Sequence, residues 1–199
     1  MPKKIKNNKR STRRDECQTP WYALDPLIRT LKKYGINPLK ESIRVLEPFA
    51  GEMLLARKLL HEGFLINATD ILEGIDFFEI IKNKKAIDRI DLIISNPPFS
   101  KKYEILKALY LLGKPFALLV PYETSAAKKA QDLFKKYGVI KIELDKRINY
   151  KMPFNGWKGT ADFPSIWYLW LGQSMKAETI TIYETIDPKG VRGDELTEK

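Results

Sequence analysis

Apolar runs typical of strands alternate with segments of helical periodicity along most of the chain. Continuous or alternating apolar residues occupy seven segments: 42–46, 64–69, 92–95, 115–120, 139–144, 166–171 and 178–183. Between most of them, apolar residues recur at helical spacing: 21–31, 53–61, 78–84, 103–112 and 125–137. Strands that alternate with amphipathic helices favour an α/β domain whose mostly parallel sheet is covered by helices on both faces.

The last part of the chain departs from this alternation. No helical pattern separates 139–144 from 166–171, so we expect these two strands to be antiparallel neighbours. The segment 178–183 alternates polar and apolar residues, as an edge strand does. We therefore predict one domain over 15–186, with a seven-stranded, mostly parallel sheet and an antiparallel last strand. A charged tail over 187–199 is expected to fray.

Composition removes several classes of protein. The chain has 199 residues with one cysteine and one histidine, which excludes an intramolecular disulfide framework and argues against zinc sites and histidine triads. We expect no metal. No apolar stretch approaches the ~20 residues that span a bilayer, and the basic N-terminus lacks the apolar continuation of a signal peptide. We therefore expect a cytoplasmic protein, in the host cytoplasm if it is viral, without a membrane partner.

Positive charge is concentrated at the N-terminus. Residues 1–14 carry seven basic residues and no acidic one, whereas the remaining 28 basic and 25 acidic residues give a net charge of only +3. Two interpretations stay open for this basic tail. It is either a flexible arm that contacts phosphates without reading sequence, or a solvated, disordered tail.

A polar and aromatic tetrad follows the apolar run 92–95 directly: Asn96, Pro97, Pro98 and Phe99. Two consecutive prolines fix φ and remove two backbone donors, which leaves carbonyls unpaired beside an amide side chain and a ring. Such a group can accept hydrogen bonds from an amine next to a stacking surface. The tetrad resembles the catalytic motif of S-adenosylmethionine-dependent amino-methyltransferases, above all the adenine-N6 enzymes of the compact phage or prokaryotic kind.

This resemblance implies a Rossmann-like class I methyltransferase fold and a catalytic role for all four residues. It also implies S-adenosylmethionine as cofactor. The turn after the first strand resembles the first cofactor motif of class I methyltransferases in Glu47, Phe49 and Gly51, but Met53 stands where the family often has a second glycine. The turn is not a dinucleotide or P-loop fingerprint, because it lacks further glycines and a Gly-Lys-Ser/Thr sequence.

Further cofactor residues follow from the same resemblance. Asp70, at the end of the second strand, matches the family's acidic residue that accepts the ribose hydroxyls. Asp76 would accept from the adenine amine, with Ile71 or Phe77 packing on the ring, although Asp76 would equally serve as a helix N-cap. The stretch 18–20, made of Gln18, Thr19 and Pro20, resembles the motif that closes over the methionine part. Its alternative is helix capping by Thr19, with Pro20 at the first helical position.

Basic and aromatic residues interleave in the segment 146–159, as expected of a loop that faces nucleic acid. This segment gives five candidates for nucleic-acid binding: Arg147, Tyr150, Lys151, Trp157 and Lys158. Lys101 and Lys102, which follow the tetrad, are two more, because they could meet a phosphate at the start of the next helix. Two alternatives remain: the aromatic residues pack over the sheet edge, and the lysines after the tetrad belong to a solvated helix start.

The expected function is transfer of a methyl group from S-adenosylmethionine to N6 of adenine in DNA. An RNA adenine-N6 methyltransferase is the first alternative, because structured RNA presents unpaired adenines without duplex flipping. A non-catalytic scaffold that binds the cofactor or nucleic acid is the second. No separate target-recognition domain is visible in the sequence, so specificity would be loose, carried by the loop up to residue 162, or supplied by a partner.

Overall fold

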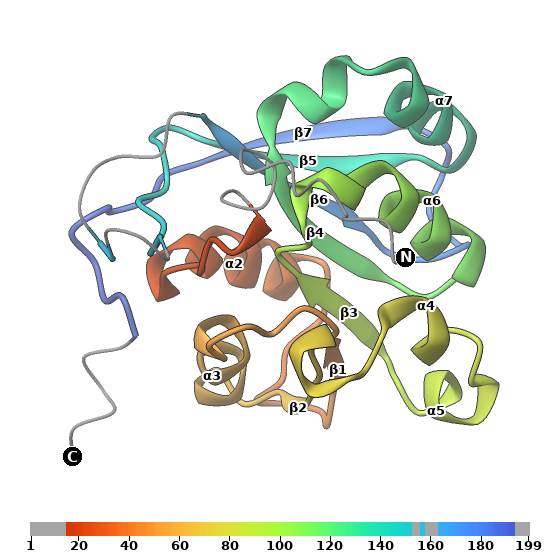
Figure 1. Cartoon of the computed structure of the whole chain (residues 1–199). Helices are drawn as coiled ribbons and strands as arrows, with labels where there is room; N and C mark the ends of the chain where they lie inside the picture. The colour runs from red at the N-terminus through yellow and green to blue at the C-terminus, as the bar shows by residue number, and fades with distance from the viewer. Residues whose placement is uncertain (1–14, 153–155, 158–162, 194–199) are drawn as a thin grey trace, which may run out of the picture.

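A computed structural model describes residues 15–152, 156–157 and 163–193. These residues form a seven-stranded sheet with the order β2-β1-β3-β4-β6-β5-β7 (Figure 1). The strands are β1 (Arg44–Glu47), β2 (Leu65–Ala68), β3 (Leu92–Ser95), β4 (Phe116–Pro121), β5 (Val139–Leu144), β6 (Ser165–Trp170) and β7 (Thr179–Glu184). The predicted Rossmann-like α/β fold class is confirmed.

One strand runs against the others. Strands β2, β1, β3 and β4 are parallel, with Leu46 of β1 opposite Asn67 of β2 and Ile93 of β3. Strand β6 is antiparallel to both β4 and β5, which confirms the predicted pairing of 139–144 with 166–171. Strand β7, the last along the chain, lies at the sheet edge parallel to β5, so the antiparallel strand is the sixth rather than the seventh.

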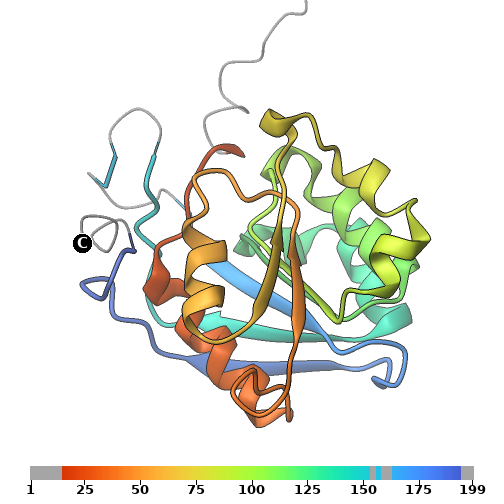
Figure 2. The same cartoon turned by 90° about the horizontal axis from the view of Figure 1, so that it is seen from below.

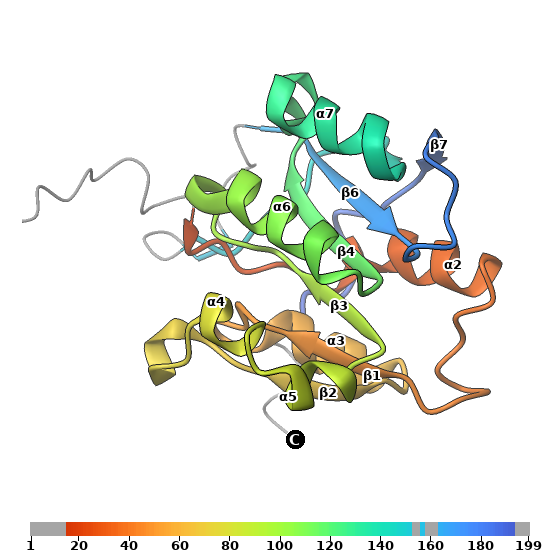
Figure 3. The same cartoon turned by 90° about the vertical axis from the view of Figure 1, so that its right-hand side faces the viewer.

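Helices cover both faces of this sheet (Figures 2 and 3). One face carries the 3-10 helix η1 (Trp21–Leu24), α2 (Asp25–Lys33) and α3 (Leu54–His61). The other carries α4 (Phe77–Ile80), α5 (Lys84–Asp88), α6 (Lys102–Leu112) and α7 (Lys128–Tyr137). Three 3-10 turns complete the set: η2 (Ile71–Glu73), η3 (Phe99–Lys101) and η4 (Tyr122–Ala126). The helix predicted over 78–84 is replaced by α4 and α5, because Asn83 caps a new helix there.

Successive residues of the strands pack alternately into two separate hydrophobic cores, one on each face of the sheet. In β3, Leu92 and Ile94 pack toward α2 and α3, whereas Ile93 packs toward α5 and α6. This alternation is what a sheet buried on both faces requires, because successive side chains point to opposite sides. None of the helices in the described part of the chain is long and apolar enough to cross a membrane.

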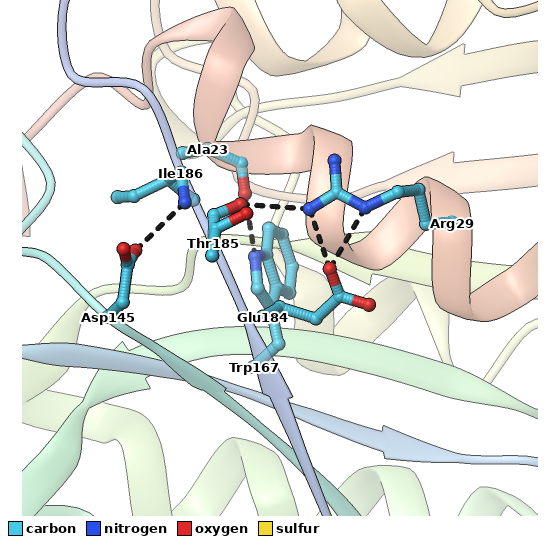
Figure 4. Close-up of polar contacts among 7 residues, drawn as sticks. All are labelled: Ala23, Arg29, Asp145, Trp167, Glu184, Thr185 and Ile186. Atoms are coloured by element: carbon cyan, nitrogen blue, oxygen red, sulfur yellow. Dashed lines mark hydrogen bonds and ion pairs between the residues drawn. The ribbon is translucent and has the colours of Figure 1, made fainter.

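Polar contacts fix η1 and α2 against strands β6 and β7 (Figure 4). The indole Nε1–H of Trp167 in β6 donates to the Ala23 carbonyl at 2.9 Å. Arg29 of α2 pairs with Glu184, the last residue of β7, at 2.6 Å and also donates to the Thr185 carbonyl. These bonds hold the start of the domain next to the end of β7.

The segment 187–193 continues from β7 over η1. The backbone N–H groups of Trp21 and Tyr22 donate to the carbonyls of Arg192 and Val191, at 3.2 and 3.1 Å. A Cβ on Gly193 would lie 2.1 Å from the Trp21 ring, so this contact requires glycine. The prediction of a frayed tail from residue 187 is therefore wrong for 187–193, because main-chain hydrogen bonds outweigh the charged character of the segment. Residues 194–199 lie outside the described part.

Candidate active site

A cavity of about 440 Å³ opens at the carboxyl ends of β1, β2 and β3. This is the edge of an open α/β sheet where ligands bind. It is lined by residues from four segments of the chain: Asp15, Glu16, Cys17, Gln18, Thr19, Glu47, Phe49, Ala50, Gly51, Glu52, Leu55, Asp70, Ile71, Leu72, Asn96 and Pro98. The cavity therefore brings together most of the predicted cofactor residues with part of the predicted catalytic tetrad.

The turn after β1 is held in place by the end of β2. The Ala50 N–H donates to the Thr69 carbonyl at 3.0 Å, and the Gly51 N–H donates to Asp70 Oδ2 at 2.9 Å. Gly51 has a φ of 49° and Met53 a φ of 66°, the left-handed region that favours glycine. Met53 is the one non-glycine residue with positive φ among the described residues. The turn thus keeps the geometry of a glycine-rich loop with a methionine in one glycine position.

Asp70 accepts two backbone hydrogen bonds and lines the cavity. Its Oδ1 accepts from the Leu72 N–H at 2.9 Å, which caps η2, while Oδ2 accepts from Gly51. Ile71 is 58% exposed and, with Leu72, forms an apolar wall beside the carboxylate. Leu72 was not predicted, because nothing in its local sequence distinguishes it from a surface leucine.

Three predicted cofactor residues do not line the cavity. Asp76 caps α4 through a 2.6 Å bond from the Phe78 N–H, which is the alternative that the sequence left open. Phe77 is buried and packs against Phe49, with ring centroids 5.3 Å apart. Pro20 is buried at the start of η1. The predicted cofactor contacts of these three residues therefore lie outside the cavity.

Glu47 is the buried carboxyl of the site, with only 1% of its surface exposed. Its Oε1 accepts from Ser95 Oγ–H at 2.5 Å and from the Phe49 N–H at 3.2 Å, whereas the buried Oε2 has no hydrogen-bond partner. Burial raises the pKa of Glu47 to about 8, because desolvation of the charged form outweighs the two hydrogen bonds that lower it. A cationic or hydrogen-bonding group in the cavity would satisfy this oxygen.

Only half of the predicted catalytic tetrad lines the cavity. Asn96 and Pro98 do so, whereas Pro97 is buried and Phe99 is 5% exposed. The Phe99 ring meets Phe163 edge to face, with centroids 5.4 Å apart. The prediction that Phe99 presents a face to a base is therefore wrong for this structure, because tertiary packing covers the ring.

Asn96 is oriented by the segment that precedes η1. Its Nδ2 donates to the Cys17 carbonyl at 2.9 Å, and its Oδ1 is buried without a hydrogen-bond partner. The amide therefore directs its acceptor atom away from Cys17. Neither Cys17 nor Asp15, which accepts from Ser100 Oγ–H at 2.6 Å, was predicted as a site residue.

Gln18 joins the same segment to the cofactor turn. Its Oε1 accepts from the Glu52 N–H at 3.0 Å, and its side chain covers Gly51, where a Cβ would lie 2.3 Å from Gln18 Nε2. Thr19 Oγ1 is buried and makes no hydrogen bond, and η1 starts without a side-chain cap. The alternative role of Thr19 as an N-cap is thus wrong, whereas Gln18 and Thr19 both line the cavity.

The predicted nucleic-acid residues divide by burial. Lys101 and Arg147 are exposed, and half-buried Lys102 donates to the Phe99 carbonyl at 3.1 Å. Tyr150 is 2% exposed and donates to Ser165 Oγ, so its prediction as a nucleic-acid contact is wrong and the core alternative holds.

Two other candidates, Lys151 and Trp157, contact the N-terminal and C-terminal segments of the described chain. Lys151 pairs with Glu52 at 2.5 Å, beside the mouth of the cavity. Trp157 is half-buried and faces the guanidinium of Arg192, 5.4 Å from the ring centroid. Lys158 and the basic tail 1–14 lie outside the described residues. No three His, Cys, Asp or Glu side chains within the described ranges are grouped as a metal site would require.

Comparison with known proteins finds likeness to solved structures but none to a known sequence family. No family model and no curated protein matches the chain. The crystal structure of a protein described as a predicted O-methyltransferase, from Agrobacterium tumefaciens, is similar to 73% of this chain and 79% of that chain. The two share 10% sequence identity, with a TM-score of 0.42.

Proposed function

We propose that this protein transfers a methyl group from S-adenosylmethionine to the exocyclic N6 amine of adenine in DNA. The observation that carries the proposal is the continuity of the cavity. One end is formed by Asp70 and the Gly51 turn, and the other by Asn96 and Pro98. A methyl donor and an amine acceptor must meet in one such space, because the transfer is an in-line displacement.

The residues at the donor end fit a nucleoside with a charged extension. The cavity falls within the range of about 300 to 1,000 Å³ typical of ligand sites. Asp70 retains lone pairs for ribose hydroxyls beyond its two backbone bonds, and Ile71 and Leu72 offer apolar contact to a planar base. The unpaired Oε2 of Glu47 would accept from the amino group of the cofactor's methionine part. Bound there, S-adenosylmethionine supplies an electrophilic methyl group.

At the acceptor end, Asn96 and the Pro97 carbonyl would accept the two hydrogens of the amine. The Asn96 amide is already oriented for this task, because Nδ2 is bonded to Cys17 and Oδ1 is left without a partner. When both amine hydrogens are held by acceptors, the nitrogen favours a tetrahedral geometry, and its lone pair is then available to attack the methyl carbon. These contacts strengthen as the nitrogen becomes cationic, so they stabilise the transition state more than the ground state.

Charge supports a nucleic acid as the acceptor. The exposed Lys101 and Arg147, together with the seven basic residues of the sequence 1–14, suit phosphate contacts. A duplex adenine would have to be flipped out at a cost of a few kcal/mol. The same residues would serve an RNA acceptor, for which an unpaired base avoids that cost.

Tritiated methyl transfer to DNA, RNA and protein in parallel tests the proposal. We expect label on N6 of adenine in DNA, identified by digestion to nucleosides. Label confined to RNA would move the assignment to the RNA alternative. Cofactor binding without label on any acceptor would support the non-catalytic scaffold and overturn the enzyme proposal.

Deletion of residues 1–14 tests the role assigned to the basic tail. Affinity for a DNA oligonucleotide falls with salt in proportion to the phosphates contacted, by a slope of about −0.9 per contact. The deletion should flatten this slope, measured by fluorescence anisotropy at several salt concentrations. An unchanged slope would remove the tail from the binding surface.

A further inference from the structure

The segment Asp15–Gln18, which we call the strap, crosses the acceptor end of the cavity. Its first residue is bonded to the start of the next helix: Asp15 Oδ1 accepts from the Ser100 N–H at 3.0 Å, and Oδ2 accepts from Ser100 Oγ–H at 2.6 Å. The carbonyl of its third residue, Cys17, accepts a hydrogen bond from Asn96 Nδ2. The strap is therefore attached on both sides of the predicted catalytic tetrad.

The other end of the strap is anchored independently. Gln18 and Lys151 exchange two backbone hydrogen bonds, at 2.9 and 3.1 Å, in an isolated antiparallel bridge. Because these bonds do not involve the tetrad, the strap can detach at Asp15 while Gln18 keeps its place. Cys17 Sγ lies 3.2 Å from Met152 Sδ, a contact that detachment of the strap must break. The Asp15 contacts with Ser100 are solvent-exposed, as expected of bonds that break easily.

With the strap in this position, both ends of the Asn96 amide are inaccessible. Its Nδ2 is bonded to the Cys17 carbonyl of the strap, and its Oδ1 is buried. An incoming amine could not reach the amide oxygen. The strap also places two acidic side chains, Asp15 and Glu16, at the cavity. These carboxylates would repel the phosphates of a nucleic acid that approaches the tetrad.

We infer that the strap is a gate over the acceptor end of the site, latched by Asp15 on Ser100 and hinged at Gln18. Release of the latch exposes Asn96, while the donor end keeps its contacts. The gate is inferred from the strap contacts alone, whereas the identity of the acceptor that it admits rests on the proposed function. Asp15 thus acts on access to the site rather than on the reaction.

The reactivity of Cys17 measures the gate directly. It is the single cysteine of the chain, lies in the strap and is 5% exposed, so a maleimide reagent reacts with it mainly when the strap opens. Asp15→Ala and Ser100→Ala should each accelerate labelling about tenfold, the loss expected for hydrogen bonds to a charged group. Asp132→Ala, which removes an exposed ion pair with Lys128, is the matched control and should not change the rate.

Global unfolding is measured alongside, by urea denaturation of each variant. Labelling that accelerates only in proportion to lost global stability, or does not accelerate, would overturn the gate. Acceptor kinetics give a second readout: Asp15→Ala should raise kcat/KM for a short adenine-containing oligonucleotide, because less binding energy is spent on opening. A fall in kcat/KM would overturn the gate. If no variant transfers methyl groups, the proposed function fails while the labelling result still decides the gate.

Discussion

The two ends of the cavity differ in how their polar groups are paired. At the donor end, Asp70 is held by the N–H groups of Gly51 and Leu72, so the carboxylate is in position before any ligand arrives. At the acceptor end, Asn96 is bonded to the strap and its Oδ1 is enclosed. The donor end is thus preorganised, which lowers the ordering cost of binding, whereas the acceptor end must open first. We expect this difference to produce ordered binding, with the cofactor before the acceptor.

Loss of the acceptor amide should have the largest effect. Asn96→Ala removes the side chain that accepts from the amine, so we expect kcat for methyl transfer to fall by ~10²-fold or more. Binding of S-adenosylhomocysteine, measured by calorimetry, should change little, because the donor end does not depend on this amide. Asn67→Ala on the exposed side of β2 is the control. Wild-type turnover in Asn96→Ala would refute the assignment of the tetrad.

A pH series on Glu47→Gln sharpens the comparison at the donor end. The pKa of Glu47 is about 8 in the folded protein against the ordinary 4.5, so the folded state holds this proton more tightly than the unfolded chain. Stability contributed by this group is therefore present below pH 4.5 and is lost as the pH rises to about 8. In thermal unfolding from pH 4 to 9, the free energy of unfolding of Glu47→Gln should increase relative to that of wild type, by about a few kcal/mol over this window.

Glu79→Gln, which only breaks an exposed ion pair with Lys82, is the control for that series. Its unfolding free energy should change with pH in the same way as that of wild type. Parallel curves for Glu47→Gln and wild type would show that burial does not hold the proton on Glu47.

Removal of the donor-end carboxylate should weaken cofactor binding without closing or opening the acceptor end. Asp70→Ala deletes the acceptor for ribose hydroxyls and for two backbone N–H groups, so we expect Kd for S-adenosylhomocysteine to rise ~10- to 30-fold. Glu73→Ala, on the same exposed turn, should leave Kd unchanged. Unaltered binding in Asp70→Ala would place the cofactor elsewhere and break the comparison.

The smallest effect is expected at Met53. Its φ of 66° is strained for a side chain, and the residue is 36% exposed, so little packing is lost on substitution. Met53→Gly should stabilise the fold by up to ~1 kcal/mol in urea denaturation, since relief of strain outweighs the entropy gained by the unfolded chain. Met53→Val should destabilise it by a similar amount. Destabilisation by glycine would show that the methionine side chain supports the turn.

Sequence patterns predicted the strands closely because each is a local apolar run. Strand β3 matches its predicted bounds, and β6 differs by one residue at each end. The turn carrying Gly51 and the carboxylate of Asp70 were predicted from their resemblance to the cofactor motifs of class I methyltransferases, at the ends of the first two expected strands. Both residues line the cavity.

The errors involve residues whose environment is set by distant segments. Tyr150 lies in a run of basic and aromatic residues typical of a binding loop, yet its hydroxyl bonds Ser165 in the core. The Phe163 ring covers Phe99. The strap binds Asn96 through the main-chain carbonyl of Cys17, a group that every residue type carries. Such contacts depend on tertiary packing, which neither periodicity nor motif spacing encodes.

The bonds that tie Gln18 to Lys151, and Trp21 and Tyr22 to Arg192 and Val191, also determine the order of assembly. The residues around the strap are synthesised well before these partners. The central strands can therefore collapse while the segment around Gln18 and η1 is still without its contacts, since long-range pairing is slow. A nascent chain that ends before residue 191 would carry the strands of the sheet without the main-chain bonds that hold η1.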